Sequence, residues 1–174
     1  MPFAPEQIED GSGLATAIVY GDEDSCAAYL ALRGKTSYAG ASGSIGGVEK
    51  KMIYLVLGTQ YIETLSAKRA LGTRSTAEQA LLFPRNGVEI DWIVQPPLYI
   101  PQGYIDATYE AAELAARGET FLDVVDEERD LKRKNIAGAI DKEWFGRHDQ
   151  VKTYHLIDQM LKPFLGSVGY RERG

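Results

Sequence analysis

The sequence predicts an all-α fold: a small bundle of four to five helices that carries a short β-hairpin and ends in an extended C-terminal arm. Apolar side chains recur at helical spacing in several stretches, and glycines or prolines end most of them. Hydrophobic residues make up 44% of the 174 residues, which is enough to fill one core. We therefore expect a helical domain over residues 1–165 and an arm over residues 166–174.

The first predicted helix covers residues 22–33. Asp22 and Asp24 place carboxylates at its amino-terminal end, where the helix dipole favours negative charge, and Gly34 ends it. Cys26 lies on the side of this helix that is expected to pack. No basic partner lies nearby in sequence, so we expect Cys26 to be a buried, unreactive thiol.

The second predicted helix follows a flexible, glycine-rich loop at residues 40–47 and ends between residues 61 and 64. Its charged residues recur on one side, which is expected to face water, while apolar residues recur on the other. The predicted buried stripe consists of Val48, Met52, Leu55, Val56 and Thr59.

A short third helix is predicted over residues 75–82. Ser75 and Glu78 have the spacing of a capping box, and Pro84 is expected to stop the helix because proline restricts the residue before it. Residues 88–98 are expected to be extended, and two consecutive prolines near their end are expected to exclude regular strand pairing.

The strongest predicted helix begins at Pro101, ends at Arg117 and is followed by Gly118. Its apolar face is rich in alanine, which permits close contact with another helix. That face consists of Ile105, Tyr109, Ala112 and Ala116, with Thr108 and Ala115 beside it.

The last part of the domain is predicted to contain the β-hairpin, over residues 131–145, and one further helix. Ala137 and Gly138 separate two stretches that are compatible with β-strands. The final helix is expected over residues 154–165, with a break at Pro163.

Charge and cysteine content exclude several classes of protein. The formal net charge is -6 and the isoelectric point is about 5.0, whereas proteins that grip nucleic acid usually present a basic face. A single cysteine excludes an internal disulfide framework and a thiolate metal site. The start of the chain lacks the pattern of a signal peptide, and no apolar run approaches the roughly 20 residues of a membrane span. We expect synthesis in the cytoplasm and no membrane partner.

The motifs that resemble catalytic or metal sites fail on spacing. Lys35 and Thr36 follow Gly34 as in a phosphate-binding loop, but that loop needs a glycine where Tyr29 stands. A helix C-cap explains the glycine better. The two histidines, His148 and His155, match no known spacing of metal ligands even with nearby aspartates. We therefore predict no enzyme activity, no metal and no cofactor.

Two charged runs lie next to the predicted hairpin. The acidic run lacks the ligand spacing of a calcium loop and is typical of a solvated face, although it could also line a channel. It includes Asp123, Asp126, Glu127 and Glu128. The basic run could contact nucleic acid together with a tryptophan, but a hairpin edge protected by cations is the simpler interpretation. This candidate hairpin interface consists of Lys132, Arg133, Lys134 and Trp144.

Several motifs along the chain resemble those of one phage protein family. They are EDGSG at residues 9–13, AAYLALRG at 27–34, QALLFPRNGV at 79–88 and the isoleucine-proline pair at 100–101. The chain resembles the small phage proteins that are often labelled DnaT-like single-stranded-DNA-binding proteins. It departs from their usual pattern at Leu82 and Phe83, where alanine and tryptophan are common, and in a longer segment at residues 90–99.

That resemblance implies a head-to-tail connector adaptor: a virion protein that forms a ring of about twelve copies beneath the portal. It implies as partners the portal protein, a stopper or tail-completion protein and further copies of the chain, with genomic DNA only passing through. The acidic run would then face the channel, and the arm would reach the portal or a neighbouring subunit. The arm residues expected at this interface are Phe164, Tyr170, Arg171 and Arg173.

The family label implies a different function, primosomal binding of single-stranded DNA. The negative net charge favours the adaptor, because an acidic lumen lets DNA slide while a DNA-binding surface should be basic. We therefore expect weak or no affinity for DNA at physiological salt, and we keep single-stranded-DNA binding as the alternative function.

Overall fold

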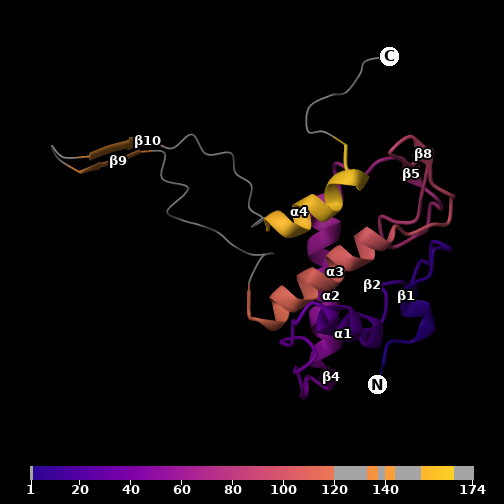
Figure 1. Cartoon of the computed structure of the whole chain (residues 1–174), viewed down its shortest axis with the longest axis horizontal. Coiled ribbons are helices and arrows are strands. Elements are labelled where there is room, and N and C mark those ends of the chain that lie inside the picture. The colour runs from indigo at the N-terminus through magenta and orange to yellow at the C-terminus, as the bar shows by residue number, and fades with distance from the viewer. Residues whose placement is uncertain (1, 120–132, 137–139, 144–153, 167–174) are drawn as a thin grey trace, which may run out of the picture. The chain divides into compact units, whose positions relative to one another are not determined.

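The computed structural model describes residues 2–119, 133–136, 140–143 and 154–166. For residues 133–136 and 140–143 it describes the backbone only. The chain divides into two compact units, Met1–Glu119 with Tyr154–Gly174, and Thr120–Thr153. The described part of the first unit holds the α-helices (Figure 1). They are α1 (Glu23–Leu32), α2 (Lys50–Ser66), α3 (Gln102–Ala116) and α4 (His155–Leu161).

The fold is mixed α/β, so the prediction of an all-α fold is wrong. The described residues also contain two short 3-10 helices, η1 (Pro5–Gln7) and η2 (Lys162–Phe164), and five two-stranded pairs. One pair is parallel, β1 (Ile8–Glu9) with β2 (Val19–Tyr20). The antiparallel pairs are β3 (Ser44–Ile45) with β4 (Val48–Glu49), β5 (Thr73–Arg74) with β6 (Arg85–Asn86), β7 (Glu89–Ile90) with β8 (Ile93–Val94), and β9 (Arg133–Ile136) with β10 (Ile140–Glu143). Most of these strands have only two residues, which is too short to leave an alternating apolar pattern in the sequence.

The ends of α1 confirm the predicted capping. The Asp22 carboxylate accepts hydrogen bonds from the Asp24 and Ser25 N–H groups, at 3.0 and 2.8 Å. At the other end, Gly34 has a φ of +68° and donates its N–H to the Ala31 carbonyl. This left-handed residue is the usual end of a helix, so the sequence around Lys35 and Thr36 is a C-cap and not a phosphate-binding loop.

Helices α2 and α3 pack directly against each other at Gly58. A Cβ atom at Gly58 would lie 2.7 Å from the Thr108 carbonyl oxygen and 2.8 Å from the Ala112 nitrogen. The two backbones therefore approach more closely than any side chain at residue 58 allows. This contact confirms that the small residues of the 101–117 segment serve close helix packing.

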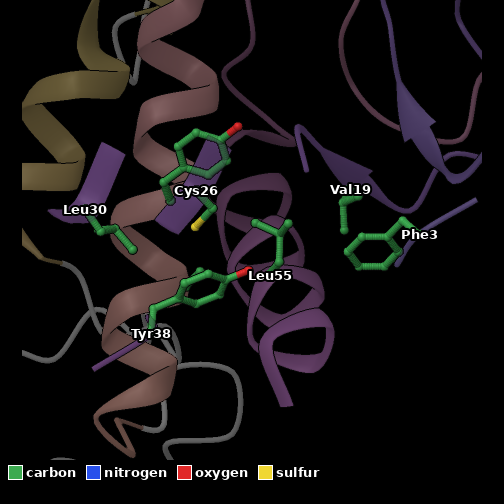
Figure 2. Close-up of a cluster of buried hydrophobic side chains, with 8 residues drawn as sticks. Phe3, Val19, Cys26, Leu30, Tyr38 and Leu55 are labelled. Carbon is green, nitrogen blue, oxygen red and sulfur yellow. The ribbon is translucent and has the colours of Figure 1, made fainter. Parts of the chain in front are cut away.

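One cluster of buried side chains joins α1, α2 and α3 to the amino-terminal segment (Figure 2). It consists of Phe3, Val19, Cys26, Leu30, Tyr38, Leu55, Tyr109 and Ala112. Burial raises the pKa of the Cys26 thiol, which keeps the thiol protonated at neutral pH. The prediction of a buried Cys26 is confirmed.

The predicted stripe of the second helix is right in its middle and wrong at its start. Leu55 and Thr59 are buried, and Met52 and Val56 are half-buried. Val48 instead belongs to strand β4 and is 44% exposed, because the helix begins only at Lys50. The neighbouring glycines allow a tight β3–β4 turn that precedes the helix.

The predicted helix at residues 75–82 is absent from the structure. Thr76 and Gln79 exchange hydrogen bonds between side chain and backbone, 3.0 and 3.1 Å long, as in a capping box. No helix follows, since the Leu82 N–H donates to the Glu63 carboxylate instead of to a carbonyl one turn back. The Phe83–Pro84 peptide bond is cis. Tertiary hydrogen bonds here outweigh the local helical signal.

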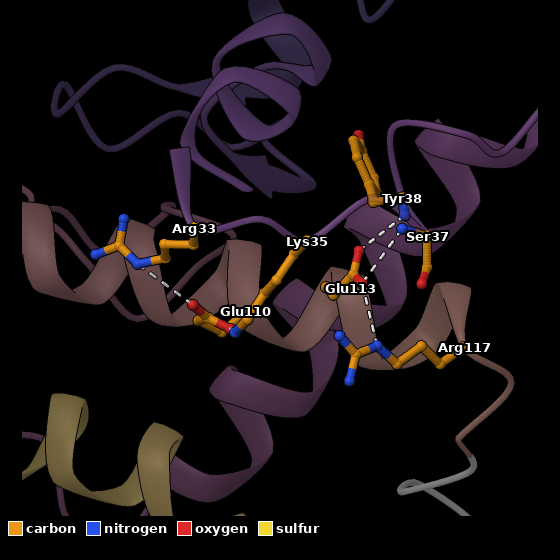
Figure 3. Close-up of polar contacts among 7 residues, drawn as sticks. All are labelled: Arg33, Lys35, Ser37, Tyr38, Glu110, Glu113 and Arg117. Carbon is orange, nitrogen blue, oxygen red and sulfur yellow. Dashed lines mark hydrogen bonds and ion pairs between the residues drawn. The ribbon is translucent and has the colours of Figure 1, made fainter. Parts of the chain in front are cut away.

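Glu113 of α3 holds the segment that follows α1 (Figure 3). Its carboxylate accepts hydrogen bonds from the Ser37 and Tyr38 N–H groups, at 3.3 and 2.8 Å, and from Arg117 Nε at 3.1 Å. Burial alone would raise the pKa of Glu113, but these donors hold it below its ordinary value. The carboxylate therefore stays charged and fixes the segment on α3.

Glu110, one turn earlier on α3, forms ion pairs with Lys35 and with Arg33 (Figure 3). The Arg33 guanidinium also lies 3.7 Å above the centre of the Tyr29 ring, in a cation–π contact. The basic residues after α1 are thus used within the fold.

The chain closes onto the body after α4. Phe164 of η2 is buried, and its ring lies edge-on to the rings of Phe83 and Tyr104 at 6.5 and 6.3 Å. The Leu71 N–H donates to the Phe164 carbonyl, and the Gly166 N–H donates to the Arg69 carbonyl. The last described residues therefore lie against the segment that follows α2.

Candidate nucleic-acid interface

The β7–β8 hairpin presents a tryptophan at its tip. Its register pairs Glu89 with Val94 and Ile90 with Ile93, so that Asp91 and Trp92 form a two-residue turn. Both turn residues have positive φ, +51° and +67°. A bulky residue in this conformation is uncommon and costs roughly 1 kcal/mol or more. Trp92 is nevertheless 92% exposed, so no packing within the described residues explains its presence.

The apolar exposure continues along the return strand and beyond it. Ile93 and Val94 are each about two-thirds exposed. Leu98 and Tyr99, which follow β8, are 61% and 39% exposed. Ile93 and Val94 are consecutive in β8, so their side chains project to opposite sides of the hairpin. We use the name hairpin face for all the exposed apolar surface that these four residues and Trp92 present, on both sides of the hairpin. Its flanking charges are acidic, Glu89 and Asp91, and residues 88–99 contain no lysine or arginine.

The base of the hairpin is fixed to the body. Val88 is buried, and its carbonyl accepts a 2.8 Å hydrogen bond from the Gln95 N–H. A Cβ at Gly72 would lie 3.1 Å from Val88 Cγ2 and 2.2 Å from the Asn86 carbonyl oxygen. Glycine is therefore required at residue 72 for the β5 segment to approach the hairpin base this closely.

The EDGSG motif forms a loop that contacts the segment after the hairpin. The buried Glu9 carboxylate accepts hydrogen bonds from the N–H groups of Gly11, Gly13 and Leu14, at 3.0, 2.8 and 2.9 Å. Gly11, with a φ of +101°, meets the backbone of the segment after β8: a Cβ there would lie 2.5 Å from the Leu98 carbonyl oxygen. The motif residues are thus a structural support for the hairpin.

Gln79, the first residue of the QALLFPRNGV motif, orders the loop that leads to the hairpin. Its side-chain amide donates to the carbonyls of Leu81, Leu82 and Pro84, at 2.8, 3.2 and 3.1 Å. The same loop contacts the EDGSG loop, because the Thr76 hydroxyl donates to the Gly13 carbonyl at 3.2 Å. Two segments that are far apart in sequence, the EDGSG loop and the loop that leads to the hairpin, are therefore in contact.

Glu63 of α2 joins this loop to the helices. Its carboxylate accepts hydrogen bonds from the Tyr20 hydroxyl at 2.7 Å, the Leu82 N–H at 2.9 Å and the Tyr104 hydroxyl at 3.3 Å. Burial raises the pKa of Glu63, although these donors partly oppose the rise. With three partners from two other segments and α3, Glu63 serves as a structural connector.

Of the residues predicted for partner binding, the structure describes only three. Phe164, proposed as an interface anchor, is packed inside the first unit. Arg133 and Lys134 lie in β9, where their backbone register partners are Glu143 and Lys142. The other proposed residues lie outside the described residues: Tyr170, Arg171, Arg173, Lys132, Trp144, Asp123, Asp126, Glu127 and Glu128.

The hairpin face was not among the predicted sites, although one signal pointed to it. The segment at residues 90–99 is longer than is usual in the family that the chain resembles, and it carries a tryptophan between isoleucine, aspartate and valine. Prolines near its end predicted no strand pairing, whereas β7 and β8 pair before those prolines begin. A metal site is not indicated either: the described residues hold no cluster of three or more His, Cys, Asp or Glu side chains that could bind an ion.

Fold and site together define a small mixed α/β protein whose motif loops display an exposed aromatic hairpin. Residues 7–173 match the protein family described as "Putative DnaT-like ssDNA binding protein", and the chain belongs to this family. No curated protein and no solved structure matches the chain. Within the described residues, no helix is both long and apolar enough to cross a membrane.

Proposed function

We propose that the protein binds single-stranded DNA by stacking bases on the hairpin face. The observation that carries this proposal is Trp92, which is held at the tip of a two-residue turn in a left-handed conformation and left 92% exposed. The family description names the same ligand class. Tyr99, which is 39% exposed and follows β8, is a second ring that a base could use.

The charge of the chain determines what kind of DNA binding is feasible. Stacking a base on an aromatic side chain contributes about 1–3 kcal/mol and needs no positive charge. The net charge of -6 and the acidic residues beside Trp92 make phosphate neutralisation a minor contribution. Binding should therefore be weak and nearly independent of salt. At a phosphate-dominated site, the logarithm of the binding constant instead falls with the logarithm of the salt concentration, with a slope of about -0.7 for each phosphate contact.

Fluorescence titration with oligo(dT) tests this proposal. The chain has two tryptophans, so a Trp144→Phe variant leaves Trp92 as the only reporter. We expect quenching by the oligonucleotide and a small change in affinity between low and high salt. Trp92→Ala removes the reporter, so its expected loss of binding is followed by the fluorescence anisotropy of dye-labelled oligo(dT). Val48→Ala removes an exposed apolar side chain of similar character from the β3–β4 pair and should change nothing. Binding that survives in Trp92→Ala would reject the hairpin face as the DNA site.

A second candidate function is the connector adaptor, a ring between portal and tail in the virion neck. The specific observation in its favour is the character of the hairpin face, an apolar strip next to two acidic residues in an acidic chain. Such a strip suits a protein partner better than a phosphate backbone. In this function the hairpin face contacts the portal, a stopper protein or a neighbouring copy.

Mass measurement separates the two candidate functions. The adaptor predicts a closed ring, either alone or after addition of portal protein, and its loss in Trp92→Ala and in Ile93→Asp. The DNA-binding function predicts unchanged mass with portal protein and a shift only with oligonucleotide. Native mass spectrometry of the full chain with each partner gives both readouts.

A further inference from the structure

The hairpin face is open in the described structure, and the chain itself contains a segment whose chemistry suits it. The face offers a large aromatic ring and aliphatic side chains beside the carboxylates of Glu89 and Asp91. Exposed apolar surface next to fixed charge is typical of an interaction site. The matching ligand would carry apolar groups with neighbouring cations.

The end of the chain leaves the body close to the base of this hairpin. Gly166 donates to the Arg69 carbonyl, and a Cβ at Gly166 would lie 3.5 Å from Leu71 Cδ2. The next residue, Gly72, contacts Asn86 and Val88, and Val88 begins the hairpin. Direct contacts therefore lead from Gly166 to the hairpin base through two residues of one loop.

The remaining chain is long enough to cover the face. Residues 167–174 can span at most about 26–29 Å when fully extended. Their sequence contains Val168 and Tyr170 as apolar groups, followed by Arg171 and Arg173. Arginine can stack its guanidinium on an indole ring while it pairs with a carboxylate. The arm thus carries the groups that Trp92, Glu89 and Asp91 would accept.

We propose that residues 167–174 bind the hairpin face of their own subunit, with Tyr170 on the apolar strip and the two arginines beside Glu89 and Asp91. An arm tethered at Gly166 has a high effective concentration at a site this near, so weak contacts suffice. If the hairpin face binds single-stranded DNA, as proposed above, the arm competes with DNA for Trp92. This regulatory consequence rests on the proposed function, whereas binding of the arm does not.

Acrylamide quenching of Trp92 tests the binding of the arm without DNA. In the Trp144→Phe protein, we expect the arm to shield Trp92, so that deletion of residues 167–174 raises the quenching constant severalfold. Tyr170→Ala and the double variant Arg171→Gln/Arg173→Gln should each reproduce part of this rise. Glu172→Gln, which alters a charge within the same segment, is the matched control and should leave quenching unchanged. Equal quenching in the full-length and deleted proteins overturns the proposal.

Oligo(dT) titration of the same proteins tests the competition. Deletion of the arm should tighten DNA binding severalfold, and a deletion that weakens binding would instead make the arm part of the DNA site and overturn the proposal. If quenching rises on deletion but neither protein binds DNA, binding of the arm stands and the proposed DNA function fails. Shielding that disappears on dilution would assign the arm to a second copy and overturn binding within one subunit.

Discussion

Leu55 and Leu32 both lie in helices, but substitution by aspartate should destabilise the protein strongly at Leu55 and only slightly at Leu32. Leu55 of α2 is completely buried in the central cluster, whereas Leu32 at the end of α1 is 88% exposed. Leu55→Asp would place an unpaired carboxylate in an apolar site and should cost several kcal/mol, enough to unfold a marginally stable domain. Leu32→Asp should cost at most about 1 kcal/mol, because the side chain is exposed and only the helix dipole and helix propensity disfavour aspartate there. Thermal unfolding followed by circular dichroism measures both, and parental melting of Leu55→Asp would show that α2 is not part of the core.

Glu63 and Glu113 are carboxylates of adjacent helices whose pKa shifts have opposite signs. The pKa of Glu63 is raised above its ordinary value of 4.5, so the folded state holds a proton that the unfolded state has lost. The stability that Glu63 contributes is therefore present below pH 4.5 and is lost as pH rises through its folded pKa. The pKa of Glu113 is lowered, so its contribution is present above pH 4.5 and is lost as pH falls.

Glutamine at each position should separate the two effects. Glu63→Gln should flatten the decline of the unfolding free energy above pH 4.5, while Glu113→Gln should flatten the decline below it. Each variant also loses hydrogen-bond acceptors, which lowers stability at all pH values by about 1–3 kcal/mol. Urea unfolding at a series of pH values gives the slopes. Identical slopes in the two variants would contradict the assignment of opposite shifts.

At the scale of elements, Gly58 shows why two helices can cross as closely as α2 and α3 do. The atoms that a Cβ at Gly58 would meet belong to the backbone of α3, which cannot move without shifting the whole helix. Gly58→Ala should therefore destabilise the protein by about 1–3 kcal/mol, although alanine is the better helix former. Gln60→Ala, on the exposed side of the same helix, should be neutral or slightly stabilising. Chemical unfolding of both variants gives the comparison, and a stable Gly58→Ala would mean that the helices are not in contact there.

Helices whose capping residues lie next to them in the sequence could be predicted from the sequence alone. Helix α1 carries its own caps in Asp22 and Gly34, and α3 begins after Pro101 and is followed by Gly118, so their bounds follow from short-range chemistry. The 75–82 segment has an equally clear capping signal and forms no helix, because its N–H groups and carbonyls bond to Glu63 and Gln79. Those partners are defined only by the fold. The short strand pairs likewise depend on contacts between segments and leave no periodic pattern.

The sequence predicted some elements of the fold, but it did not predict the candidate site. Motif residues such as Glu9 and Gln79 mark the family, yet in the structure their side chains order the loops in which they lie. The exposure of Trp92 depends on a left-handed turn that contains no glycine or asparagine, which are the residues that usually reveal such turns. The negative net charge disfavours phosphate contacts only, because stacking on an exposed ring needs no positive charge.

At the scale of the whole molecule, the two compact units can be separated without opening the first one. The chain leaves the first unit after Glu119 and returns at Tyr154, and the Tyr154 hydroxyl donates a 2.8 Å hydrogen bond to the Glu119 carboxylate. The Tyr154 ring also lies edge-on to Tyr61 of α2, with ring centres 6.3 Å apart. The two ends of the removed segment are therefore neighbours within one unit, and a short glycine linker can join them.

Replacing residues 120–153 with such a linker distinguishes the two candidate surfaces of the protein. Folding loses less entropy when it closes a shorter loop. The first unit should therefore remain folded, with a melting temperature equal to or above that of the full chain. If bases stack on the hairpin face, the shortened protein should bind oligo(dT) with undiminished affinity. The basic run and Trp144 are removed in this variant, so an interface at Lys132, Arg133 and Lys134 predicts that binding is lost. Fluorescence titration of Trp92, the sole tryptophan that remains, decides between the two surfaces.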